Sequence, residues 1–90
     1  MTFISDLPRI RWACRRGMLE LDLMLLPFLE FRYSSLTVEE RQAFLSLLNC
    51  NDQELYQWLL GKGVVNDPAL IDIVRLIREY FAAKHVITKV

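Results

Sequence analysis

The sequence Arg15-Arg16-Gly17-Met18-Leu19-Glu20-Leu21-Asp22 leads directly into the most apolar segment of the chain, residues 23–29. Glycine inside a helix costs about 1 kcal/mol relative to alanine, so we expect one helix to end near Gly17 and a second to begin there. Arg16 and Glu20 are four residues apart and would share one face of that second helix. Arginine before glutamate is the weaker order for such a pair. Two interpretations follow: the charges are solvated at a helix junction, or they form a recognition patch.

The second helix is expected to run from Gly17 to about Phe31 and to be apolar on nearly every side. Residues at the spacing i, i+3, i+4 and i+7 predict its buried stripe: Leu21, Met24, Leu25 and Phe28. More leucines stand between them, so this helix either lies at the centre of the core or leaves part of its surface to a partner. Pro27 lacks a backbone donor and predicts a kink or a break.

Four further helices are indicated by local start and stop signals and by apolar spacing. They begin after a cap at Asp6, with Pro8 in the first turn, after Thr37 with Glu40 completing a capping box, after Asn51-Asp52, and after Asp67 with Pro68 in the first helical position. Gly61 is expected to end the fourth, and the fifth is expected to fade near Lys84, followed by a tail or a short extension. Ser34 and Ser35 indicate a loop.

The fold class predicted from these elements is all-α, a single compact bundle of five short helices. One domain is expected to span residues 1–90, with an ordered core over about residues 8–84. No stretch alternates between polar and apolar residues as a strand would. Leu48, Trp58 and Ile77 are predicted to be buried in the core.

Composition limits the classes of function. Eleven basic and eleven acidic residues cancel, so the chain as a whole is not drawn to nucleic acid or to an anionic membrane. The cysteines Cys14 and Cys50 match no metal or redox spacing, and His85 is the single histidine, so two buried thiols in a reducing compartment are expected. No signal peptide is seen, and the apolar run is too short and too charged to span a membrane. A cytoplasmic protein is therefore expected, without metal and without membrane insertion.

No phosphate loop and no nucleophile signature is present, which argues against an enzyme. Two surfaces remain as binding candidates. The first is a basic face made of Arg9, Arg11, Trp12, Arg15 and Arg16, which suits nucleic acid, a protein contact or simple solvation. The second is the Arg16/Gly17/Glu20 junction beside the surplus apolar side chains of the second helix. Glycine permits close approach of a partner backbone, and arginine and glutamate offer charged hydrogen bonds, so this junction favours recognition of another protein.

Arg16-Gly17-Met18-Leu19-Glu20 resembles the Arg-Gly-x-x-Glu motif of the succinate dehydrogenase assembly factors, the small flavinylation factors of bacteria and mitochondria. The resemblance covers roughly residues 8–80. It also rests on an ordered series of matches: Trp12-Ala13-Cys14-Arg15, Leu21-Asp22, Pro27-Phe28, Leu36-Thr37, Glu40, Leu47-Leu48, Cys50, Asp52, Trp58-Leu59 and Val74-Arg75-Leu76-Ile77.

The resemblance implies a five-helix bundle that binds the flavoprotein subunit of succinate dehydrogenase, and often that of fumarate reductase. It implies that the protein promotes covalent attachment of FAD to a histidine of that subunit. FAD then belongs to the partner, and no cofactor is expected to be tightly bound to this chain. The functional residues of the motif are Arg16, Gly17 and Glu20, and we add Asp22, Arg15 and Arg11 as further candidate partner-binding residues.

Three alternatives stay open at this point. One is a regulatory protein that binds nucleic acid through its arginine-rich first helix. Another is a structural dimer formed through the apolar second helix, although a monomer is expected. The family has also been labelled an antitoxin component, for which the sequence offers no physical support.

Overall fold

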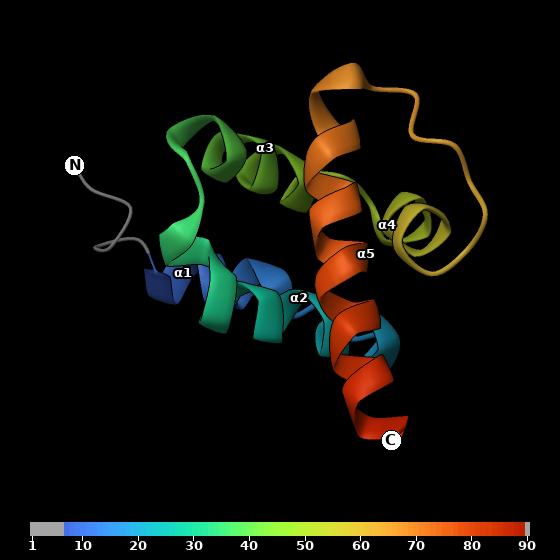
Figure 1. Ribbon diagram of the computed structural model, residues 1–90. Coiled ribbons are helices and arrows are strands. Elements are labelled where there is room, and N and C mark those ends of the chain that lie inside the picture. The colour runs from blue at the N-terminus through green and yellow to red at the C-terminus, as the bar shows by residue number, and fades with distance from the viewer. Residues whose placement is uncertain (1–6, 90) are drawn as a thin grey trace.

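The computed structural model describes residues 7–89, with side chains described for residues 7–83. Over that range the chain forms five α-helices and one short 3-10 helix (Figure 1): α1 (Leu7–Cys14), α2 (Leu19–Arg32), η2 (Tyr33–Ser35), α3 (Val38–Leu48), α4 (Asp52–Leu59) and α5 (Pro68–Lys89). No strand occurs among these residues, so the predicted all-α bundle of five helices is confirmed.

The helices are arranged around the long helix α5, which packs against α2, α3 and α4. Figure 1 shows α5 crossing in front of α2 and α3, with α4 and the loop that follows it on one side. The short helix α1 packs against α2 and α3. The linker from α1 to α2 therefore lies close to both the core and the molecular surface.

The core is formed by apolar side chains from all five helices, and no polar side chain is buried among the described residues. The predicted stripe of α2 (Leu21, Met24, Leu25 and Phe28) is buried. At its centre, the ring of Phe28 lies 5.6 Å from that of Phe44 and 5.9 Å from that of Tyr80. The predicted burial of Leu48, Trp58 and Ile77 is likewise confirmed.

Helix α2 also carries apolar side chains on its outer side. Leu19 is 69% exposed and Leu23 is 52% exposed. The two stand four residues apart and share a face directed away from the core. This helix therefore occupies the core and at the same time presents apolar surface to solvent. That a partner covers this surface stays a prediction.

The capping signals predicted from the sequence are present. The Glu40 backbone N–H donates to Thr37 Oγ1 (3.1 Å), and the Thr37 N–H donates to the Glu40 carboxylate (2.9 Å), completing the capping box. Asp67 caps α5 by accepting from the Ala69 N–H at 3.0 Å. A second capping box, between Asn51 and Glu54, starts α4 and was not predicted. The predicted cap at Asp6 lies outside the described residues.

Three boundaries differ from prediction. Helix α2 continues through Pro27, so the proline does not break it. The donor that proline lacks would have paired with the carbonyl of Leu23, and Leu23 stands on the exposed side, within reach of water. Ser34 and Ser35 belong to the turn η2 instead of an irregular loop. Helix α5 continues past Lys84 to Lys89, because no glycine or proline interrupts it after Ala82 and Ala83.

The buried side of α5 provides a stability prediction. Replacing fully buried Ile77 with alanine should lower the free energy of unfolding by about 2–5 kcal/mol, because it removes core contacts and leaves a cavity. The matched control is Ile71→Ala on the same helix, where the side chain is 46% exposed and the loss should be clearly smaller. Urea unfolding followed by circular dichroism measures both. Equal losses for the two variants would show that the core face of α5 is wrongly assigned.

Candidate partner-binding site

The linker of residues 15–18 joins α1 to α2, and its conformation depends on Gly17. Gly17 has φ +81°, the only positive φ among the described residues. A Cβ built on it would meet no atom within 4 Å, so the glycine is required by the backbone conformation and not by crowding. A side chain in this conformation costs roughly 1–2 kcal/mol. The prediction that Gly17 separates two helices is confirmed in outline, although α1 ends at Cys14 and α2 begins at Leu19.

Arg16 is turned inward, and its guanidinium donates to four oxygen atoms. Three of them belong to helices α1, α3 and α4, and the fourth lies in the turn between α3 and α4. Its Nε donates to Asp52 Oδ1 at 2.8 Å, at the start of α4. Its Nη1 donates to the carbonyls of Ala13 and Leu48, both at 2.9 Å, and Nη2 donates to the carbonyl of Cys50 at 2.7 Å. We call this arrangement the Arg16 clasp.

The clasp satisfies groups that helices leave without partners. Ala13 lies in the last turn of α1 and Leu48 is the last residue of α3, so neither carbonyl has an intrahelical donor. A cation beside these C-terminal carbonyls also complements the negative end of each helix dipole. Because the Arg16 side chain is only 15% exposed, these bonds are partly shielded from water.

The structure corrects the predicted face shared by Arg16 and Glu20. Arg16 is not helical, and its guanidinium is engaged by the clasp. The positive φ at Gly17 instead turns the chain so that the Arg16 backbone N–H donates to Asp22 Oδ1 at 2.7 Å. Asp22 therefore holds the linker in place, and Glu20 is exposed, with no ion pair or hydrogen bond to the described residues.

The two other candidate arginines lie on α1 and just after it. Arg11 Nη1 pairs with Glu30 Oε1 of α2 at 2.8 Å, with both side chains about half exposed. An ion pair as exposed as this one adds little stability. Arg15 is exposed and stands 6.0 Å from the ring of Trp12, which is itself largely exposed. Of the four arginines in the predicted basic face, Arg16 is bound in the clasp and Arg11 is paired with Glu30. The other two, Arg9 and Arg15, are exposed.

The residues that remain accessible form what we call the motif surface: Gly17, Leu19, Glu20 and Leu23. They combine one carboxylate with two exposed leucines and a stretch of uncovered backbone. Sequence reasoning identified Gly17 and Glu20 but missed Asp52 as the ion-pair partner of Arg16. Asp52 is 36 residues from Arg16 in the sequence. The only local signal that could have pointed to it was its position at a helix start, directly after the Asn51 cap.

The prediction of two buried thiols is confirmed for Cys14 and wrong for Cys50, which is only partly buried because it lies in the turn between α3 and α4. Burial raises the pKa of the Cys14 thiol to about 12, against an ordinary 9.0, and burial also raises the pKa of Cys50. No group of His, Cys, Asp or Glu side chains within the described part of the chain is arranged to hold a metal ion. Likewise, none of the described helices is both long and apolar enough to cross a membrane.

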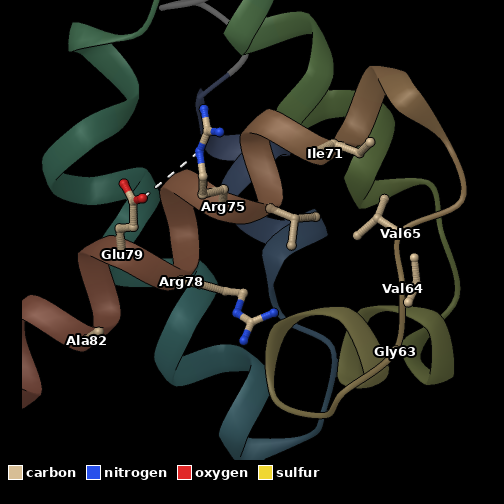
Figure 2. Close-up of a pocket in the computed structure, with 9 residues that line it drawn as sticks. Gly63, Val64, Val65, Ile71, Arg75, Arg78, Glu79 and Ala82 are labelled. Atoms are coloured by element: carbon tan, nitrogen blue, oxygen red, sulfur yellow. Dashed lines mark ion pairs between the residues drawn. The ribbon is translucent and has the colours of Figure 1, made fainter.

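The surface has two hollows of note. The larger, about 530 Å³, lies between α5 and the loop after α4, where Val64, Val65, Ile71 and Val74 supply apolar walls (Figure 2). Of the two arginines that line it, Arg75 is paired with Asp72 and Glu79 on its own helix. The smaller, about 390 Å³, lies between Met18 and α4. None of the candidate residues lines the larger hollow, whereas the smaller one touches the linker next to Gly17.

Replacement of Arg16 by lysine tests the clasp. A lysine ammonium cannot supply the planar fork that reaches all four oxygens, so part-buried acceptors would lose their donors. We expect the free energy of unfolding to fall by about 2–4 kcal/mol. Arg15→Lys is the matched control, because the neighbouring exposed arginine should change stability by only about 0.5 kcal/mol or less. Thermal unfolding of both variants gives the comparison, and equal stability would contradict the clasp.

Known proteins resemble this chain over most of its length. The family model described as flavinator of succinate dehydrogenase matches residues 8–81. The FAD assembly factor SdhE of Yersinia pseudotuberculosis is 48% identical over 75 residues, which are 83% of this chain and 85% of that protein. Proteins of the same name from Serratia sp. and Shewanella oneidensis are each 44% identical over 75 residues, covering 83% of this chain and 85% and 92% of theirs. The chain therefore belongs to the family of flavinators of succinate dehydrogenase.

Proposed function

We propose that this protein is an assembly factor that binds the flavoprotein subunit of succinate dehydrogenase and promotes covalent attachment of FAD to it. The observation that carries the proposal is the family match over residues 8–81, together with relatives named FAD assembly factor. The flavoprotein subunit of fumarate reductase is a second substrate of the same kind. The partner performs the chemistry, and this chain acts as a dedicated chaperone and not as an enzyme.

The motif surface supports a protein contact as the working interaction. Leu19 and Leu23 offer apolar area, Glu20 offers an unpaired carboxylate at its edge, and Gly17 leaves backbone accessible. An apolar centre with a few polar groups at its rim is the usual composition of a specific protein interface. The inward Arg16 contributes by fixing the shape of this surface, because it ties the linker to α3 and α4.

FAD belongs to the partner in this proposal. A site for FAD on this chain would need donors for the pyrophosphate next to a cavity for the flavin ring. The larger hollow has apolar walls, but Arg75 is engaged by two carboxylates and Arg78 extends toward the carbonyl of Trp58 at 3.4 Å. The smaller hollow is lined by one carboxylate and no basic side chain. These residues do not fit a dinucleotide.

The mechanism that follows is a population shift. The bond between the flavin and the histidine forms within the flavoprotein subunit, and this protein binds most tightly to the conformer in which those groups are aligned. The factor must then leave so that the mature enzyme can assemble, which requires a moderate and reversible interface. A cytoplasmic monomer satisfies that requirement, because a dimer formed through α2 would cover the motif surface.

Binding of nucleic acid through α1 is the weaker candidate. Arg16 is turned inward and Arg11 is paired with Glu30, so the basic face is smaller than the sequence indicates. Phosphate contacts give a steep linear fall of log affinity with log salt, whereas an interface with an apolar centre does not. A salt titration of binding therefore separates the two candidates.

Glu20→Ala tests the proposed function. The variant should fold normally, with a loss of about 1 kcal/mol or less from the dipole of α2, yet fail to promote flavinylation. The assay expresses the flavoprotein subunit in cells that lack this factor, adds back wild type or variant, and reads flavin fluorescence of the subunit after denaturing electrophoresis. Only covalently bound flavin survives that treatment.

The matched control is Glu39→Ala, which removes an exposed carboxylate from the first turn of α3. Each substitution removes a negative charge from the first turn of a helix, where it interacts favourably with the helix dipole, so the two variants differ only in location. Wild type and Glu39→Ala should restore fluorescence and Glu20→Ala should not. Full restoration by Glu20→Ala would remove this carboxylate from the working surface.

A further inference from the structure

The smaller hollow adjoins the motif surface and is not part of the Arg-Gly-x-x-Glu triad. Met18 forms one side, and Asp52, Gln53, Tyr56 and Gln57 of α4 form the other. Met18 lies directly after Gly17 and two residues before Glu20, so the hollow extends from the linker to α4. A partner that contacts Gly17 and Glu20 would therefore come within reach of it.

The chemistry of the hollow is that of a site for a cation with an apolar stem. Asp52 uses Oδ1 to accept from Arg16 Nε, and its second oxygen accepts no donor from the described residues. A carboxylate has room for about four hydrogen bonds in all. No basic side chain lines the hollow, and the amide oxygens of Gln53 and Gln57 add acceptors.

Apolar contacts are provided on both sides. Met18 presents a flexible thioether, and the ring of Tyr56 is partly exposed on α4. A guanidinium stacks on an aromatic face while its fork donates to a carboxylate, a combination that an ammonium matches less well. The positive end of the α4 dipole opposes a cation, but Asp52 and Glu54 in the first turn offset it.

We propose that this hollow receives an arginine side chain of the flavoprotein subunit, in a second contact that supplements the motif surface. The inference rests on the proposed function, because that function supplies the partner. In the complex, the arginine donates to Asp52 and to the glutamine amides while its stem lies between Met18 and Tyr56. Arg16 and the incoming arginine then share one carboxylate, so the internal clasp and the interface meet at Asp52.

Opposite charges placed at Gln53 provide the test. Gln53 is exposed and lines the hollow, and it makes no bond in the clasp. Gln53→Lys should weaken binding of the purified, unflavinylated flavoprotein subunit by about tenfold or more, through like-charge repulsion. Gln53→Glu should bind as tightly as wild type or more tightly. Dissociation constants from biolayer interferometry give the comparison, and the gap should narrow at high salt.

The controls locate the effect. Gln42→Lys makes the same change at an exposed glutamine of α3, outside the hollow, and should leave affinity unchanged. Tyr56→Phe should retain binding because it keeps the ring, whereas Tyr56→Leu should weaken it. Melting temperatures of all variants should match that of wild type, because Gln53, Gln42 and Tyr56 are all exposed.

The outcomes separate this inference from the proposed function. Equal affinities for Gln53→Lys and Gln53→Glu, with wild type binding and Glu20→Ala failing, would overturn the arginine site and leave the proposed function standing. Weaker binding by Gln53→Glu than by Gln53→Lys would point to an anionic group and also overturn it. Failure of wild type to bind the subunit would overturn the proposed function, and this inference with it.

Discussion

The hydrogen bonds of Arg16 hold together the part of the molecule from which its function is expected to arise. One guanidinium ties the last turn of α1, the end of α3 and the start of α4 to the linker before α2. Such a fork satisfies acceptors that would otherwise face a part-buried space without donors. The left-handed turn at Gly17 and the bond from Arg16 N–H to Asp22 depend on this placement, because they return the chain from the clasp into α2.

This arrangement gives the residues of the motif different roles. Arg16 and Asp22 make hydrogen bonds within the protein that fix the linker. Gly17 and Glu20 remain exposed to solvent beside Leu19 and Leu23. A rigid linker lowers the conformational entropy lost when a partner binds, so under the proposed function we expect the internal residues to support affinity without touching the partner. Arg16, Gly17 and Glu20 are a poor combination for stabilising a helix. The structure explains why they suit this position, because none of the three stabilises a helix by pairing with a residue one turn away.

Much of the fold was predictable from local signals, and most of the site was not. The stripe of α2, the Thr37 capping box and the Asp67 cap depend on residues within one or two helical turns, and each is present. The pairing of Arg16 depends on Asp52 and Cys50, more than thirty residues away, and on a backbone angle that spacing rules do not supply. Helical spacing placed Arg16 and Glu20 on one face of the second helix, but α2 begins only at Leu19 and Arg16 pairs with Asp52. The continuity of α2 at Pro27 depended on which side of the helix meets solvent, and this too is set by the tertiary fold.

The central claim is that Arg16 acts from inside the protein while Gly17 and Glu20 act at its surface. Hydrogen exchange of the arginine Nε–H groups, followed by nuclear magnetic resonance with and without the flavoprotein subunit, tests this claim most directly. Because Arg16 Nε–H donates to Asp52 in a part-buried setting, it should exchange much more slowly than that of exposed Arg15 and should keep its protection when the subunit binds. The backbone amides of Gly17 and Glu20 should become protected only in the complex. Exchange of Arg16 as fast as that of Arg15 in the free protein, or protection of Arg16 that appears only with the partner, would contradict the account.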